Sequence, residues 1–415
     1  MAAQPSLANE APEAQLALDP MDPRDAADID LGTAELLALY RTTGPLTRAE
    51  VSERTGWARM TVNSRLDRLV DLGLLEPHGQ TTAARGRPAT RFRFHAGRGA
   101  LLVADIGASG MRLALCDLGG AVRRRVDVPV DIAAGPDAVL GEVERHFDQM
   151  VAAEGVAGAV WGVGASLPGP VEYATGTIVE PPIMTGWNGT RVPDRFGPRY
   201  GVPVVVENDV NAMARGEQAT CYPDVADLLF LKIGTGVGAG VIANGAVLRG
   251  AQGAAGDIGH TWADAGEAGP RPLCRCGKQG CVESYASGWA IVRDLVAAGR
   301  SVTSVDQVVE LVLNGDPMAT SLVRDAGRVI GASLAHVVSL LNPSVIVVGG
   351  QLAAADEHLL AGIRERIYAR SLPLATRELQ ITRSRLDGDA GVLGLARGVA
   401  DTVLSPAVLT GRAAS

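Results

Sequence analysis

The sequence lacks the features that would place it in a membrane or outside the cell. None of its apolar runs is long enough to cross a bilayer, and its first residues do not form an export signal. Periodic repeats are also absent, so the 51 glycines and 23 prolines indicate many tight turns and not low complexity. We therefore expect a cytoplasmic protein without membrane contact, whose 415 residues, 47% of them hydrophobic, form two or three domains.

Cysteine is scarce, and three of the five cysteines lie together. Cys274, Cys276 and Cys281 fall within eight positions, and His260 precedes them in the same loop region. Thiolate sulfur and imidazole nitrogen are the ligands that a tetrahedral structural zinc prefers, so these four residues form a complete Cys₃His set. A disulfide with one thiol left over is the alternative, but it requires an oxidising compartment of which the chain gives no sign. The sequence predicts a structural Zn²⁺ site.

Charge is unevenly spread along the chain. The net charge is −8, but residues 41–98 contain eleven arginines against five acidic residues, an excess of six positive charges. A basic segment on an acidic protein indicates contact with a polyanion such as nucleic acid. Residues 1–30 have few large apolar side chains, and we expect them to form a disordered tail.

The basic segment has the pattern of three helices. Residues 36–40 predict a first helix that stops at Gly44, and Thr47 with Glu50 predicts a capping box at the start of a second. A third helix from about 58 to 72 carries an apolar stripe and leaves polar residues off it. This pattern is typical of a helix-turn-helix. We expect its third helix to contact DNA through Arg59, Thr61, Ser64, Arg65 and Arg68.

Two short strands are predicted behind the third helix. Residues 74–76 and 91–94 have strand character, and a polar loop containing Arg-Gly-Arg-Pro at 85–88 joins them. Such a hairpin is a wing, and Arg85 and Arg87 suit the narrow minor groove of DNA. A three-helix interaction module with a solvated basic face is the alternative. We favour a winged helix-turn-helix domain at 31–96, because the arginines gather on the two elements that would touch DNA.

The character of the sequence changes after about Gly99. Three apolar strands each run into a glycine turn, at 101–107, 228–238 and 345–350. One such turn is a weak signal, since strand ends often carry glycine. Three of them in an alternating α/β pattern favour a nucleotide-binding ancestor with two lobes around a cleft.

From about Gly99 to its last residues the sequence resembles the ROK family, named for repressors, open reading frames and sugar kinases. The matching segments follow the family's order and are DIGAS (105–109), LPGP (167–170), ENDVNAMARGE (207–217), GTGVGAG (234–240), DIGH (257–260), CRCGKQGCVE (274–283) and NPSVIVVGG (342–350). The resemblance implies a two-lobed, actin-like and hexokinase-like α/β ATPase fold. The smaller lobe is expected at 99–215 plus 384–410, and the larger lobe, with the zinc loop, at 216–383.

The resemblance also implies roles for individual residues. Asp209 matches the general base that takes the proton of a sugar hydroxyl in the family's kinases. His260 would bind zinc through one ring nitrogen and offer the other to the sugar. The implied sugar site comprises Gly169, Asn208, Asp209, Asp257, His260 and Glu283. The implied nucleotide site comprises Asp105, Gly107, Ser109, Gly234, Thr235, Gly236, Gly238, Gly349 and Gly350.

The sequence departs from the kinase pattern at two places. Active kinases read Asp-x-Gly-Gly-Thr-Lys at the phosphate hairpin, whereas Ala108, Ser109 and Gly110 fill the last three places here. The added methyl crowds a backbone that must approach phosphate, and the missing lysine removes a cation. At the zinc loop the family's glutamate is Asp257, one methylene shorter. We expect ATP and Mg²⁺ to bind only if kinase activity is retained.

Two functions remain open on the sequence. We favour a sugar-responsive transcriptional repressor of carbohydrate genes, in which a sugar or sugar phosphate closes the lobes and alters the grip of a homodimer, or a higher homo-oligomer, on a double-stranded DNA operator. The alternative is an ATP-dependent hexose kinase with a DNA-binding appendage. The sequence names neither the sugar nor the operator.

Overall fold

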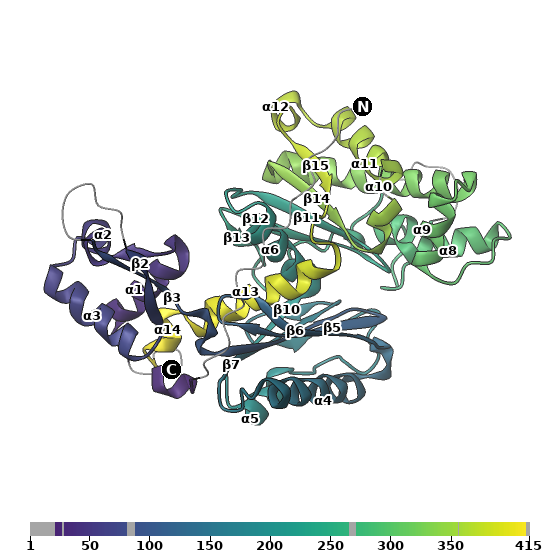
Figure 1. The fold of residues 1–415 in the computed structure, drawn as a ribbon. Coiled ribbons are helices and arrows are strands. Elements are labelled where there is room, and N and C mark those ends of the chain that lie inside the picture. Colours follow the sequence, from purple (N-terminus) through teal and green to yellow (C-terminus); the bar gives the residue numbers. More distant parts are fainter. Residues whose placement is uncertain (1–20, 27–28, 81–87, 265–270, 356, 412–415) are drawn as a thin grey trace.

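The computed structural model describes residues 21–26, 29–80, 88–264, 271–355 and 357–411. An N-terminal domain of three helices and a small sheet is followed by two lobes, each built on a five-stranded sheet (Figure 1). Within the described ranges, no helix combines the length and apolar character needed to span a membrane.

The N-terminal domain confirms the prediction of a winged helix-turn-helix. Helix α1 ends at Gly44, and Thr47 and Glu50 form the reciprocal capping box at the start of α2. The predicted stripe of α3 is buried except at Val70, which is half-buried. The tip of the wing, with Arg85 and Arg87, lies outside the described residues. The elements are α1 (Leu31–Thr43), β1 (Leu46–Thr47), α2 (Arg48–Thr55), α3 (Arg59–Asp71), β2 (Leu75–Gln80) and β3 (Thr90–Phe94), with strand order β1-β3-β2.

The predicted tail at 1–30 is wrong for the part that the structure describes. Pro23–Ala26 forms a 3₁₀ helix, and Met21, Ala26 and Ile29 are buried. The indole nitrogen of Trp161, in the first lobe, donates to the carbonyl of Met21 at 3.1 Å. Few apolar residues suffice here because the segment adds to an existing core and does not build one of its own.

The first lobe contains a mixed sheet of order β10-β7-β4-β5-β6. Its first three strands in sequence are antiparallel neighbours, and β7 and β10 continue the sheet in parallel with β4. Helices α4 and α5 lie along one side of this sheet in Figure 1. The elements are β4 (Ala100–Ile106), β5 (Gly110–Asp117), β6 (Val122–Pro129), α4 (Pro136–Glu154), β7 (Val160–Leu167), β8 (Val171–Glu172), β9 (Thr177–Ile178), α5 (Pro193–Tyr200) and β10 (Val204–Asn208).

The second lobe repeats this topology. Its sheet has the order β13-β12-β11-β14-β15, again with an antiparallel trio followed by two parallel strands. Two sheets of the same order confirm the predicted actin-like arrangement. The elements are β11 (Leu228–Ile233), β12 (Val237–Ala243), β13 (Ala246–Val247), α7 (Val282–Ala286), α8 (Gly288–Ala297), α9 (Val305–Leu313), α10 (Pro317–Leu341), β14 (Val345–Gly349), α11 (Glu357–Arg370), α12 (Pro373–Thr376) and β15 (Gln380–Arg383).

Two helices, α6 (Asp209–Cys221) and α13 (Ala390–Val403), pack against each other between the sheets (Figure 1). Their backbones approach closely, since a methyl group at Gly216 would lie 2.0 Å from the carbonyl oxygen of Ala390. Any side chain there would force the helices apart. The lobe boundary predicted between residues 215 and 216 falls inside α6, and the position of the boundaries remains a prediction.

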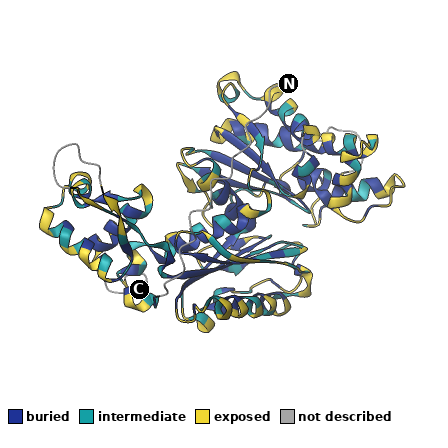
Figure 2. Ribbon diagram, in the orientation of Figure 1, coloured by how far each residue is buried: buried dark blue, intermediate teal, exposed yellow. Residues whose placement is uncertain are grey.

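The N-terminal domain shares its hydrophobic core with the first lobe. Leu36 of α1 and Leu66 of α3 belong to the same buried cluster as Leu101 of β4 and Val399 of α13. The short helix α14 (Pro406–Leu409) contacts α1 and completes this bridge. Figure 2 shows buried residues running along α13 from the lobes to the N-terminal domain. The N-terminal domain is therefore packed onto the first lobe and not tethered by a linker alone.

Candidate functional site

A cleft of about 870 Å³ lies where the two sheets face each other. Its walls come from the β4–β5 hairpin, the start of α6, the turn between β11 and β12, and the loop that carries the predicted zinc ligands. Every residue predicted to bind sugar lines this cleft, and so does every residue predicted to bind nucleotide except Gly349. Segments far apart in sequence thus meet in one cavity of ligand-binding size.

Asp105 lies at the phosphate hairpin, near the end of β4. The hydroxyl of Ser166, on the neighbouring strand β7, donates to Asp105 at 2.7 Å. Burial raises the pKa of Asp105 above its usual value, against the opposing effect of this hydrogen bond. A methyl group at Gly107 would lie 3.0 Å from the carbonyl oxygen of Gly110, which explains the glycine at this tight turn.

Asn208 and Asp209 lie at the junction of β10 and α6. The side-chain oxygen of Asn208 caps α6 by accepting from Val210 and Asn211, and its amide donates to the carbonyl of Gly169 at 3.1 Å. Asn208 therefore has a structural role beside the predicted sugar contact. The carboxylate of Asp209 is buried and accepts a hydrogen bond from the ammonium of Lys232 in β11.

Glu283 stands between the cleft and the cysteine loop. Its carboxylate accepts from the backbone nitrogen of Val237 at 3.1 Å and from the indole of Trp289 at 3.5 Å. Val237 begins β12 and Trp289 lies in α8, so donors from two different elements hold the carboxylate in place. The glutamate is buried and lines the cleft, and the Cys274 thiol lies 4.0 Å from its Oε1.

His260, Cys274, Cys276 and Cys281 converge as the sequence predicted. One potential ligand atom from each residue lies within 4.8 Å of all the others. Sulfur and Nδ1 are 3.6 Å apart between Cys274 and His260, and the sulfurs of Cys276 and Cys281 are 3.7 Å apart. Tetrahedral Zn²⁺ with Zn–S of about 2.3 Å implies about 3.8 Å between sulfurs and about 3.5 Å between sulfur and nitrogen. The set therefore fits a metal ion such as zinc.

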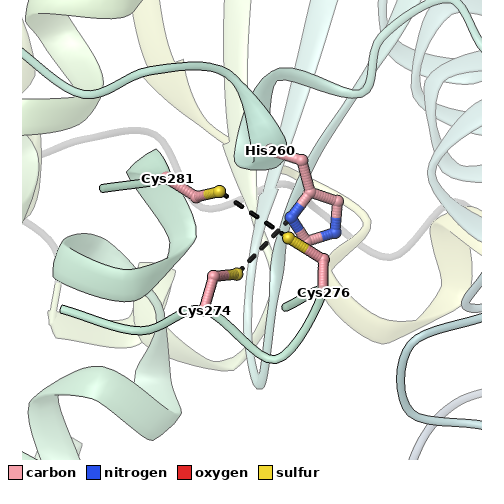
Figure 3. A group of neighbouring side chains, drawn as sticks. All are labelled: His260, Cys274, Cys276 and Cys281. Carbon is pink, nitrogen blue, oxygen red and sulfur yellow. Dashed lines mark hydrogen bonds between the residues drawn. The ribbon is translucent and has the colours of Figure 1, made fainter. Parts of the chain in front are cut away.

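The imidazole of His260 faces the cysteine sulfurs with Nδ1 and turns its other nitrogen away from them (Figure 3). His260 also lines the cleft. A metal bound through Nδ1 would hold the ring in place and keep Nε2 free for a ligand. A disulfide between Cys276 and Cys281 would need a separation of about 2.05 Å, which their sulfurs do not have.

The glycine turns of the predicted nucleotide site differ in their role. Gly350 has a φ of +88°, and a methyl group there would lie 2.5 Å from the carbonyl oxygen of Ile233, so this position requires glycine. Gly349 does not line the cleft; a side chain there would strike the ring of Phe230 at 2.5 Å. Gly349 therefore has a packing role in the structure, and its nucleotide contact stays a prediction.

Several residues of the cleft wall escaped the sequence analysis. Lys232 is the most consequential, and its signal was a lysine within the otherwise apolar strand 228–233. Other polar and aromatic side chains of the wall come from β5, the cysteine loop, α8, the segment after β14 and the end of β15. They include Arg112, Arg275, Trp289, Gln351 and Arg383.

The predicted DNA-contacting side chains of α3 are not equally accessible. Arg59, Ser64 and Arg68 are exposed, and Thr61 is half-buried. The guanidinium of Arg65 instead stacks 4.2 Å from the ring centre of Trp57 and lies 3.5 Å from Asp30. These contacts hold Arg65 within the domain, so a base contact through Arg65 would require breaking them. Met60, which the sequence analysis passed over, is 79% exposed beside Arg59.

Comparison with known families agrees with this architecture. Residues 102–401 match the ROK family, and residues 35–76 match a winged helix-turn-helix DNA-binding family. The chain belongs to the ROK family. The resemblance drawn from the sequence motifs is therefore confirmed, together with the fold that it implied.

Relatives of this ROK protein include both repressors and kinases. It is 25% identical to a putative xylose repressor of Caldicellulosiruptor sp. over 375 residues, covering 87% of this chain and 93% of the relative. It is 27% identical to the transcriptional regulator NagC of Escherichia coli, covering 86% and 89% of the two chains. The glucokinase of Halalkalibacterium halodurans is 29% identical, but covers 70% of this chain. The repressors match the length that includes the DNA-binding domain, and the glucokinase does not.

Solved structures show the same difference. A ROK family transcriptional regulator, a homologue of the E. coli Mlc protein, matches with a TM-score of 0.76 and 27% identity, covering 94% of this chain and 98% of its own. A ROK glucokinase from Streptomyces griseus in complex with glucose and AMPPNP matches with a TM-score of 0.60 and 28% identity, covering 72% and 99%. The arrangement of domains follows the regulators.

Proposed function

We infer that this ROK protein is a sugar-responsive transcriptional regulator, and most simply a repressor of carbohydrate genes. The observation that carries this inference is helix α13, which begins at the cleft and ends at the DNA-binding domain. At its start, a methyl group on Gly391 would lie 2.3 Å from the carboxylate of Asp105. At its end, Asp401 accepts a hydrogen bond from Arg41 of α1 at 2.9 Å. A change in the cleft therefore has a short physical route to the helix-turn-helix.

Helix α6 provides a second, parallel connection. It begins at Asp209 in the cleft, and its Arg215 lies 4.0 Å from Asp401. Asp401 thus lies within ion-pair distance of one arginine of α6 and one of the DNA-binding domain. Closure of the lobes on a ligand would move α6 and α13 together, because their backbones are in contact. Allosteric control follows if the sugar binds the released and DNA-bound arrangements with different affinity.

The sugar site of this proposal consists of the predicted residues that line the cleft. Asp209 and Glu283 would accept hydrogen bonds from sugar hydroxyls, and Nε2 of His260 would make a further one. A structural Zn²⁺ bound by His260, Cys274, Cys276 and Cys281 would fix the imidazole and supply no chemistry of its own. Asp257, which is exposed at the cleft wall, would complete the site.

The DNA site of this proposal is the exposed face of α3. Arg59, Ser64 and Arg68 are placed to meet phosphates or base edges in the major groove, as the second helix of a helix-turn-helix does. One such domain offers little surface, so we expect a homodimer that binds two half-sites of an operator. The repressor relatives support this proposal, since their match includes the DNA-binding domain.

The test is a measurement of operator affinity with and without sugar. DNA sites selected from a random-sequence pool would be titrated by fluorescence anisotropy in the presence of xylose, glucose, N-acetylglucosamine and their phosphates. We expect one of these to change the affinity by about 5- to 150-fold, the usual range of allosteric coupling. Absence of sequence-specific DNA binding would contradict the proposal.

The glucokinase relatives keep hexose phosphorylation as the alternative function. A coupled assay with ATP and the same neutral sugars separates the two functions. Turnover of about 1–100 per second would support the kinase. We expect no turnover above the buffer control.

A further inference from the structure

Lys232 occupies a position in the cleft that bears on the chemistry the cleft can perform. It lies in β11, two residues before the glycine turn, and its ammonium donates to one carboxylate oxygen of Asp209. The Asp209 side chain is 9% exposed and that of Lys232 is 27% exposed, so the pair lies at the inner wall. The ion pair is therefore little screened by solvent.

This contact conflicts with the task of a general base. A base must accept the proton of a sugar hydroxyl during transfer. A proton accepted by Asp209 would remove the charge that pairs with the Lys232 ammonium, so the ion pair that the structure shows would be lost. Loss of a partly buried ion pair opposes this proton transfer. Asp209 can still accept a hydrogen bond from a hydroxyl, because its other oxygen is free of the Lys232 contact.

The same ammonium opposes a nucleotide-bound cation. Mg²⁺ needs carboxylate, phosphate or water oxygens, and Asp105 and Asp209 are the cleft carboxylates whose charges act on Lys232. Burial alone would lower the pKa of Lys232, but the charges of Asp209 and Asp105 raise it above its usual value. Lys232 thus stays positively charged near both acids. The residues present do not fit a Mg²⁺–nucleotide complex in the kinase manner.

We propose that Lys232 determines the ligand specificity of the cleft. Because of its ammonium, the cleft binds a carbohydrate and does not bind a Mg²⁺–nucleotide complex. Its ammonium takes over the neutralisation of the cleft carboxylates that a divalent cation would otherwise supply. It also fixes Asp209 as a hydrogen-bond acceptor for a ligand hydroxyl. The altered hairpin with Ala108 and Ser109 agrees with this assignment, since it too lacks the kinase features. The inference rests on the proposed sugar-sensing function and deepens it.

The experiment compares nucleotide binding with and without a divalent cation in the full-length protein. The probe is AMPPNP, titrated by calorimetry with either Mn²⁺ or EDTA, and Mn²⁺ alone is followed by electron paramagnetic resonance. Wild type is expected to show no tightening by Mn²⁺. Lys232→Met, which keeps the length and removes the charge, is expected to gain a Mn²⁺-dependent tightening of about tenfold or more. Adding Asp209→Asn to this variant should remove the gain.

A control and a second variant keep the outcome decisive. Arg377→Met removes an exposed charge elsewhere in the same lobe and should behave as wild type. If Lys232→Met does not fold, Lys232→Thr replaces it. The wild-type measurement tests the inference independently of both variants. A tenfold Mn²⁺ effect in wild type, or none in a folded Lys232 variant, would overturn the inference.

These results are separable from those for the proposed function. Loss of the Lys232 inference alone would leave sugar-dependent operator binding intact in wild type. If the Lys232 variant gains Mn²⁺-dependent nucleotide binding but no sugar changes the operator affinity of wild type, the proposed function is contradicted and the role of Lys232 is retained.

Discussion

The pair between Arg41 and Asp401 is expected to carry much of the communication between cleft and DNA-binding domain. The Arg41 side chain is 11% exposed and that of Asp401 is 45% exposed. Burial lowers the pKa of Arg41 and the charge of Asp401 opposes this, so the guanidinium depends on its partner. An ion pair with one largely buried and one exposed partner is expected to contribute a free energy of about 1–2 kcal/mol. This lies between the values for surface pairs and for fully buried pairs. This corresponds to roughly 5- to 30-fold in an equilibrium constant.

The perturbation is Asp401→Asn, which keeps the size of the side chain and removes its charge. The measurement is the ratio of operator affinities without and with the effector sugar. We expect this ratio to fall by roughly 5- to 30-fold or to the point where coupling disappears. Linkage requires that the effect of operator DNA on sugar affinity fall by the same factor, and calorimetry checks this independently.

Arg397→Gln is the matched control. Arg397 reaches Asp401 at 3.3 Å along the exposed surface of α13, so its loss removes one ion pair of Asp401 and leaves the hydrogen bond from Arg41 in place. Coupling should change by less than about twofold, as for an exposed helix pair. The reasoning fails if Asp401→Asn retains full coupling, or if the two variants lose coupling equally.

Three further results are expected. Cys276→Ser should abolish stoichiometric zinc in elemental analysis and weaken sugar binding by about 10- to 100-fold through loss of His260 orientation; unchanged sugar affinity in metal-free protein would contradict this. Arg59→Ala should weaken operator binding and lower the slope of log affinity against log salt by about one if it contacts phosphate, whereas the exposed Arg377→Ala should alter neither. Thr47→Ala should cost about 1 kcal/mol in the first urea unfolding transition and Thr47→Ser much less, and equal losses would argue against the cap.

Local signals in the sequence settled much of the architecture. The start of α2 was predictable because a capping box involves only residues three positions apart. The end of α1 at Gly44 follows from glycine and the proline after it. The His/Cys cluster that could hold a metal ion was predictable because the side chains that bind metals are few and their metal preferences are chemical. The two-lobed fold came from family motifs, whose order along the chain was sufficient.

Contacts between distant segments were not predictable in this way. Met21 is buried because Trp161, 140 positions later, lies beside it. Arg65 has the helical position of a DNA contact, but Trp57 and Asp30 take up its guanidinium. Gly349 must be glycine because the ring of Phe230 fills the space that a side chain would need. In each case the environment of the residue is set by a side chain that folding brings in from another element.

By itself, the sequence determined the helices of the DNA-binding domain, the glycine turns and the histidine and cysteines that could hold a metal ion, because short-range geometry and ligand chemistry fix these. The tertiary structure alone decided that Lys232 meets Asp209, and that Asp401 lies within ion-pair distance of both Arg215 and Arg41. The physical reason is that charge interactions depend on distance through space and on burial, and a single chain's spacing encodes neither.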